Sequence, residues 1–151
     1  MKEIIIIDGN NLLKKSNIKG SGEDDRLTLY EKVKSRLGLH QKCIFFFDGY
    51  GESSKDDIIF SYDKTADELM KNYIEKNYLR EVITVISTDR GITEFAEVCS
   101  CKIKLSEKFW AEINNPVSNK NINQLYIPPE EYEKPERMSK KDLDEFRKYF
   151  S

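Results

Sequence analysis

Residues 3–11 read EIIIIDGNN, in which four consecutive isoleucines are followed by an aspartate, a glycine and two asparagines. An unbroken run of β-branched apolar residues is typical of a strand that is buried on both faces, as the central strands of parallel sheets are. Aspartate followed by glycine predicts a turn where the run ends. We therefore expect a parallel strand over Glu3–Asp8, with Asp8 at its carboxyl end.

Four more segments have the composition of strands, and helical patterns lie between most of them. The expected strands are Lys42–Asp48, Ile58–Tyr62, Val82–Thr88 and Lys102–Leu105. Apolar residues recur at helical spacing over 29–37 and 65–74, and Ser106 is expected to cap a short helix over 106–113. Strands that alternate with helices predict an α/β domain with a mainly parallel sheet of about five strands. The link between residues 48 and 58 is too short for a full helix, so one crossover is expected to be a loop.

The length of 151 residues predicts one domain. Residues 1–113 contain every expected strand and form its core. From residue 114 the chain turns polar and holds all four prolines, which predicts an extended connection. Ser139 and Asp142 then form a capping-box pattern for a last helix with one apolar face. We expect this tail, residues 114–151, to dock on the same domain.

Charge and hydropathy exclude several classes of protein. The chain has 25 Lys and Arg against 27 Asp and Glu, a net charge of −2, so it lacks the general basic field of an indiscriminate nucleic-acid binder. The longest apolar runs, Ile4–Ile7 and Cys43–Phe47, are too short to span a membrane, and the first residues do not read as a signal peptide. We therefore expect a cytoplasmic protein without a membrane partner. Three cysteines without metal-binding spacing predict neither a disulfide framework nor a zinc site.

Three aspartates stand at the carboxyl ends of expected strands, namely Asp8, Asp48 and Asp89. In open α/β sheets, ligands bind at that edge. If the first strand is central, a spacing of about 4.8 Å between neighbouring strands brings the three carboxylates into one crevice. A fourth acid, Asp67, lies in the first turn of the helix that Thr65 caps and is expected to face the core edge.

Other polar residues flank these acids. Glu68 occupies the capping-box position after Thr65, so its expected role is to support the site from the helix end. Glu68 also falls with Lys71 on the expected outer face of that helix. Asn11 and Ser87 are short polar residues beside the acids, and we expect them to hold a carboxylate or a bound water by hydrogen bonds.

Four carboxylates without nearby histidine or cysteine make a site of hard oxygen ligands, which suits Mg²⁺ or Mn²⁺ rather than Zn²⁺. The single histidine, His40, lies far in sequence from every acid and is expected at the surface. A metal-bound water would then be the nucleophile, and the metal would also neutralise a phosphate, which is the chemistry of phosphodiester hydrolysis. Each acid alone also has a structural reading, because aspartate is common in turns and at helix N-termini.

Four short motifs carry these acids. They are Asp8-Gly9-Asn10-Asn11, Phe46-Phe47-Asp48, Thr65-Ala66-Asp67-Glu68 and Ser87-Thr88-Asp89-Arg90. In order and spacing they resemble the DGYN, VFD, TADE and TSDR segments of the YacP-like NYN-domain ribonucleases, a branch of the PIN-like nucleases. The resemblance implies a three-layer α/β/α PIN-like fold and a metal-dependent endoribonuclease. It assigns Asp8, Asp67 and Asp89 to the metal-binding positions and Asp48 as a further acid, while Asn10 replaces the aromatic residue of the family motif.

The expected substrate is RNA that is single-stranded or locally unpaired and is cut internally. Since the net charge is negative, a few cations beside the acids must hold the phosphates. Arg90 directly follows Asp89, and Lys64 precedes the helix that carries Asp67, so we expect both cations to contact the substrate. Few contacts imply weak affinity, which predicts help from the ribosome or another ribonucleoprotein acting on mRNA.

Other readings compete with the nuclease. A PIN-like module that keeps its acids but only binds RNA or a ribonucleoprotein, without turnover, remains open. A receiver-type phosphotransfer domain also gathers aspartates, but it needs an acidic pair after the first strand and a lysine at the end of the fifth, where Gly9-Asn10 and Leu105-Ser106 stand. A haloacid-dehalogenase-type phosphatase would need a second aspartate at the position of Asn10.

Overall fold

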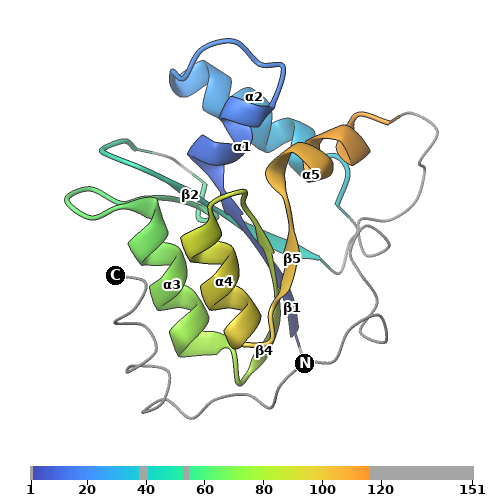
Figure 1. The fold of residues 1–151 in the computed structure, drawn as a ribbon. Helices are drawn as coiled ribbons and strands as arrows, with labels where there is room; N and C mark the ends of the chain where they lie inside the picture. Colours follow the sequence, from blue (N-terminus) through green and yellow to red (C-terminus); the bar gives the residue numbers. More distant parts are fainter. Residues whose placement is uncertain (1, 38–40, 53–54, 116–151) are drawn as a thin grey trace.

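The computed structural model of the protein describes residues 2–37, 41–52 and 55–115. Within them, five strands and five helices alternate along the chain (Figure 1). The strands are β1 (Lys2–Asp8), β2 (Lys42–Phe47), β3 (Ile58–Phe60), β4 (Glu81–Ile86) and β5 (Lys102–Lys104). The helices are α1 (Gly9–Lys15), α2 (Glu23–Lys34), α3 (Ala66–Asn77), α4 (Arg90–Val98) and α5 (Ser106–Ile113). The extended connection and the last helix expected over 114–151 lie almost wholly outside the described residues.

The sheet is parallel throughout, and β1 lies at its centre. The strand order is β3-β2-β1-β4-β5, and every neighbouring pair is parallel. Ile7 of β1 pairs with Phe45 of β2 on one side and with Ile86 of β4 on the other. The predicted parallel sheet is therefore confirmed, and the first strand has the central place that the expected crevice requires. The register sets Asp8 beside the residue that follows β4.

Different helices cover the two faces of this sheet, as Figure 1 shows. Ile4 and Ile6 pack in a buried cluster with residues of α3 and α4, whereas Ile5 and Ile7 pack in a second cluster with residues of α1, α2 and α5. Successive side chains of one strand point to opposite faces, so the isoleucine run supplies both cores. This arrangement confirms the predicted three-layer α/β/α fold.

Two helices, α1 and α4, were not predicted from the sequence. Each begins directly after a predicted site residue. Asp8 is the N-cap of α1, and Asp89 is the N-cap of α4. The prediction that Ser106 caps α5 is wrong, since Leu105 is the N-cap and Ser106 is the first residue of the helix. The Ser106 hydroxyl instead donates a hydrogen bond to Asn11 Oδ1 at 2.6 Å.

The remaining connections follow the predictions where the structure describes them. The described part of the link between β2 and β3 contains no helix, as its length predicts. All three cysteines are buried thiols. None of the helices in the described ranges has the length and apolar character needed to cross a bilayer.

Gly9 should be the most size-sensitive position at the start of α1. A Cβ at Gly9 would lie 2.4 Å from the ring of Phe47, which is fully buried and has no room to move. We expect Gly9→Ala to lower the free energy of unfolding by about 3 kcal/mol, the upper end of the usual cost of overpacking. Urea denaturation measures this loss. Gly22→Ala is the matched control, because its nearest neighbour atom would lie 3.5 Å away, and its expected cost is about 1 kcal/mol or less. Equal losses for the two variants would contradict the packing argument.

Candidate functional site

Asp8 is the buried acid at the carboxyl edge of the sheet. Its side chain is 8% exposed. One carboxylate oxygen accepts a hydrogen bond from the Ser87 hydroxyl at 3.1 Å, and the other accepts one from the backbone N–H of Asn11 at 3.4 Å. The carboxylate therefore joins the end of β1 to the first turn of α1 and to the residue after β4.

The surroundings of Asp8 make its carboxyl a weaker acid than a solvent-exposed aspartate. Burial raises the pKa of the Asp8 carboxyl from its ordinary 3.8 to about 6, although the hydrogen bonds from Ser87 and Asn11 act in the opposite direction. The charges of Asp48 and Asp89 raise this pKa further. Three of the predicted acids are thus close enough at this edge for their negative charges to repel one another.

Asp48 and Asp89 are more exposed than Asp8, and each also supports the start of a helix. Asp48 Oδ1 accepts a hydrogen bond from the backbone N–H of Ala66, the first residue of α3, at 2.7 Å. Asp89 Oδ1 accepts one from the N–H of Ile92 in α4 at 3.2 Å. A carboxylate has two oxygens with several lone pairs, so one capping bond leaves it able to bind a further partner. Each of these acids can therefore stabilise a helix start and also bind a ligand.

Asp67 is paired with a lysine that the sequence analysis assigned to the outer face of its helix. Lys71 Nζ lies 3.2 Å from Asp67 Oδ2, and the Lys71 side chain is only 4% exposed. The prediction of a solvent-facing Lys71 is wrong because α4 packs beside α3 and covers that position. A buried ammonium stands at the edge of the acidic site as a result.

Gly91 has no side chain, which leaves room for the Lys71 ammonium beside Asp89. A Cβ at Gly91 would lie 3.1 Å from Asp89 Oδ1 and 3.7 Å from Lys71 Nζ, so both groups approach the same point on α4. The other oxygen of Asp67, Oδ1, is buried and has no hydrogen-bond partner among the described residues. A buried acceptor without a donor is costly, which makes this oxygen a candidate ligand for a bound cation.

Asn11 and Ser87 connect the loops that carry the acids. Asn11 Oδ1 accepts hydrogen bonds from the Thr88 backbone N–H at 2.9 Å and from the Ser106 hydroxyl. The Ser87 hydroxyl donates to Asp8 and accepts from the Asp89 backbone N–H at 3.0 Å. These two side chains fix α1, the loop after β4 and the start of α5 relative to one another.

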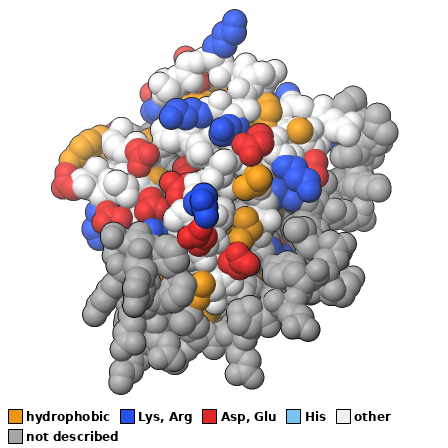
Figure 2. All heavy atoms as spheres, viewed as in Figure 1, with side chains coloured by type: hydrophobic (Ala, Val, Ile, Leu, Met, Phe, Trp, Pro, Cys, Tyr) orange, Lys and Arg blue, Asp and Glu red, His pale blue; other side chains and the backbone are white. Residues whose placement is uncertain are grey.

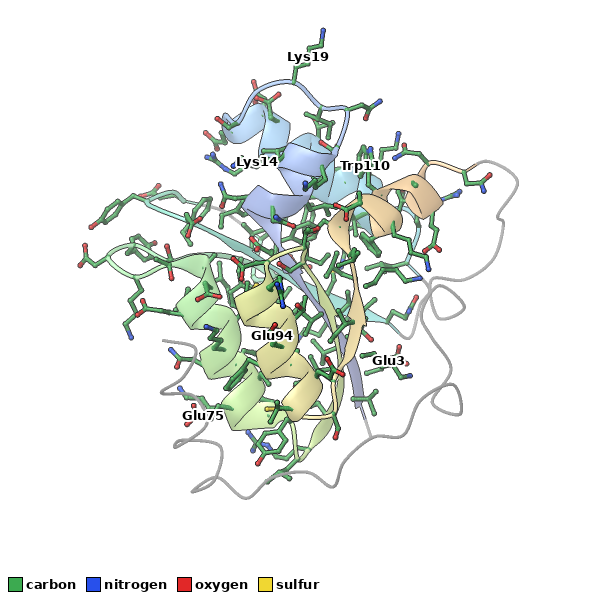
Figure 3. The ribbon with its side chains drawn as sticks, in the orientation of Figure 1. Glu3, Lys14, Lys19, Glu75, Glu94 and Trp110 are labelled. Carbon is green, nitrogen blue, oxygen red and sulfur yellow. The ribbon has the colours of Figure 1, made fainter. Side chains whose placement is uncertain are left out.

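The other predicted flanking residues lie farther from the buried acid. Glu68 and Thr65 form the predicted capping box, in which Thr65 Oγ1 accepts from the Glu68 N–H and Glu68 Oε2 accepts from the Thr65 N–H. The Arg90 side chain is 90% exposed and pairs with Glu94 one turn along α4, where Figure 3 labels Glu94. Lys64 is exposed in the loop before α3. Both predicted cations are thus at the surface of the site.

A cleft opens beside Asp8 and Asp48, two of the three acids expected to share a crevice, but most of its wall was not singled out from the sequence. Its volume is about 580 Å³, and Leu13, Lys14 and Ile18 contribute to its wall. The lining comes from α1 and from the loop that follows it, a segment without a motif. Figure 3 shows Lys19 projecting from this loop away from the sheet. In Figure 2, acidic and basic side chains are mixed over this face, with basic ones at the top of the view.

The donor atoms fit a hard divalent cation, although they do not form a closed cage. Within the described ranges, no group of three histidine, cysteine, aspartate or glutamate side chains is arranged to hold a metal ion. The acids nevertheless offer only carboxylate oxygens, and Asp67 Oδ1 is buried and unpaired. Such oxygen-only donor sets suit Mg²⁺ or Mn²⁺.

Comparison with known proteins identifies the family of the chain. The model of the YacP-like NYN domain matches residues 5–151, so the chain belongs to that family. The fold is similar to a crystal structure of a mutant form of Rae1 (YacP) from Bacillus subtilis, with a TM-score of 0.62 and 20% sequence identity over 74% of each chain. No curated protein matches the sequence significantly.

Replacing the buried acid tests its electrostatic cost. The pKa of Asp8 is higher in the folded protein than in the unfolded chain, so folding favours the protonated carboxyl. The stability that this proton binding provides is complete below pH 3.8 and is lost as the pH rises through about 6. Asp8→Asn keeps an N-cap side chain without the charge. In chelator, we expect the variant to match the wild type at pH 4 and to exceed its free energy of unfolding by up to about 3 kcal/mol at pH 7.5.

Urea denaturation at the two pH values measures this difference. Asp56→Asn is the control, because Asp56 is an exposed acid away from the site. A gain for Asp8→Asn that is the same at both pH values would contradict the assigned environment of Asp8.

Proposed function

We propose that the chain is a metal-dependent endoribonuclease that hydrolyses internal phosphodiester bonds of RNA. The observation that carries this proposal is the buried carboxylate of Asp8, held in the field of Asp48 and Asp89 at the carboxyl edge of the sheet. Membership of the YacP-like NYN domain family supports it. Such a concentration of negative charge, where open α/β sheets bind ligands, favours a cation and its anionic substrate.

Mg²⁺ or Mn²⁺ is the proposed cofactor, and Asp8, Asp48, Asp67 and Asp89 are its proposed ligands. When bound, such an ion lowers the pKa of a coordinated water and neutralises charge on a phosphate. The protein's own residues hold the acids ready for it. Ser87 orients the Asp8 carboxylate, Asn11 fixes the loop that carries Asp89, and Glu68 fixes the first turn of α3.

Lys71 limits the negative charge that the site must hold. Its buried ammonium neutralises Asp67 Oδ2 and leaves Oδ1 for the ion. In our proposal Asp67 therefore binds through one oxygen, while Asp8 supplies the least hydrated carboxylate. Mg²⁺ keeps several of its waters and usually contacts one or two carboxylates directly, so the other proposed ligands would bind it through water.

The proposed substrate is single-stranded or locally unpaired RNA, such as mRNA in the cytoplasm. Arg90 and Lys64 are exposed at the rim and would contact phosphates, and the cleft beside Asp8 would accept the adjoining nucleotides. With a net charge of −2, the chain cannot hold a long polyanion by general attraction. The ribosome or another ribonucleoprotein is the proposed source of the missing affinity.

One observation favours a second candidate, a PIN-like module that binds RNA or a ribonucleoprotein without cutting it. The described acids do not converge into a three-ligand metal group. If the acids stay this far apart when RNA binds, their role would be limited to capping the first turns of the helices. A cleavage assay separates the two candidates.

Labelled single-stranded RNA should be cut internally with Mn²⁺ or Mg²⁺ and should stay intact in chelator. We expect Asp8→Asn and Asp89→Asn to lower the cleavage rate by more than about 100-fold, and Ser87→Ala by roughly 10- to 100-fold, because Ser87 acts through the acids. Gel analysis of end-labelled RNA measures each rate, and DNA of the same sequence is the substrate control. Full activity in Asp89→Asn, or equal cleavage of DNA and RNA, would contradict the proposal.

Reversing the charge of the rim cations tests the phosphate contacts. We expect Arg90→Glu and Lys64→Glu each to raise KM and to reduce the slope of log KM against log salt by about 1, because each removes one phosphate contact. Steady-state cleavage at several salt concentrations measures both quantities. Lys76→Glu, an exposed charge reversal in the last turn of α3, should leave them unchanged. If all three variants behave alike, Arg90 and Lys64 do not contact the substrate.

A further inference from the structure

Two aromatic side chains are exposed beside the acidic edge, although most aromatic residues in the described ranges are buried. Tyr50 is 70% exposed and Tyr62 is 54% exposed. Their ring centroids lie 5.5 Å apart and their planes meet at 71°. In this edge-to-face arrangement the rings support each other, yet flat ring surface remains open to solvent.

The two tyrosines are held in place by both loops that carry them. The Tyr50 hydroxyl donates a hydrogen bond to Asp63. The Tyr62 backbone N–H donates to the carbonyl of Gly49 at 2.8 Å, and its hydroxyl donates to the carbonyl of Gly51 at 3.4 Å. The pair is therefore positioned before any ligand arrives, which lowers the entropic cost of binding on these rings.

The backbone at Tyr62 is in the left-handed region, with a φ of 55°. This conformation is unfavourable for a bulky residue, and glycine or asparagine would adopt it more easily. Tyr62 is the second residue of a turn that the Lys64 backbone N–H closes by donating to the Ser61 carbonyl at 3.0 Å. Strained backbone that presents a side chain to solvent is characteristic of binding sites.

The position of the pair connects it to the proposed site. Tyr50 lies two residues after Asp48, whose carboxylate bonds the first N–H of α3, and Lys64 lies two residues after Tyr62. In Figure 1 the loops after β2 and β3, which carry the tyrosines, project together from the same side of the sheet. Aromatic surface, a cation and an acid thus follow one another along this edge.

We propose that Tyr50 and Tyr62 form a stacking platform for an unpaired base of the RNA substrate, an inference that rests on the proposed function. Every base has a π face, so the rings can stack on any unpaired base. Lys64 would contact the adjoining phosphate. The Asn10 side chain accepts a hydrogen bond from the Asp48 N–H at 2.7 Å, which ties the first turn of α1 to the loop that carries Tyr50.

Binding of a fluorescent single-stranded oligoribonucleotide in chelator tests the platform without cleavage. We expect Tyr50→Ala and Tyr62→Asn to weaken binding by about 5- to 100-fold. Tyr50→Phe should weaken binding much less than Tyr50→Ala, because it keeps the ring and loses only the hydrogen bond to Asp63. Asparagine is chosen at position 62 because it tolerates the left-handed backbone. Binding of duplex RNA should be the same for all variants, since its bases are not available to the rings.

Leu79→Ala is the matched control, because Leu79 is 49% exposed and lies between α3 and β4, at the opposite end of the strands. Thermal melting establishes that each variant is folded. The platform is overturned if Tyr50→Ala binds single-stranded RNA like the wild type, if Tyr50→Phe is as weak as Tyr50→Ala, or if the wild type binds no single-stranded RNA. Cleavage with metal is measured separately on the wild type, so a nuclease without the platform and a platform without nuclease activity give different results.

Discussion

β1 is enclosed on both faces of the sheet, and the site takes its position from that burial. Its four isoleucines pack alternately into two cores, so the strand has one register and one direction. Asp8 follows the last of them and cannot move away from the protein interior. The same packing that stabilises the sheet therefore holds the Asp8 carboxylate in a buried position, where its negative charge lowers the stability of the folded protein. This position is the edge of the sheet where the proposed ligand would bind.

The remaining acids are held by the starts of helices. Asp8, Asp89 and Asp48 each accept a hydrogen bond from a backbone N–H in the first turn of α1, α4 or α3. Helix N-termini stabilise negative charge, so three carboxylates can approach one another without a bound cation. Lys71 supplies the one buried positive charge that the described residues place at Asp67. In our proposal, these contacts hold the acids in place before a cation binds.

Hydrophobic periodicity predicts the strands and the longer helices. It does not predict a helix that begins directly after a strand or on a site motif. The isoleucine run predicts β1 and its burial on both faces, and the Thr65–Glu68 pattern predicts the capping box of α3. It does not predict α1 and α4, because their first residues belong to the motifs of the acids. The burial of Lys71 depends on how α4 packs against α3, and the cleft depends on a loop without a motif. Such features arise from tertiary contacts, which no local pattern contains.

The most direct test of the central claim is the position of a bound ion. We would measure anomalous X-ray diffraction at the manganese edge from crystals of the protein grown with Mn²⁺. We expect a peak within about 2.5 Å of a carboxylate oxygen of Asp8, with Asp48, Asp67 or Asp89 as a second ligand. A protein that requires Mn²⁺ for RNA cleavage but whose manganese peak lies away from all four aspartates would contradict this claim.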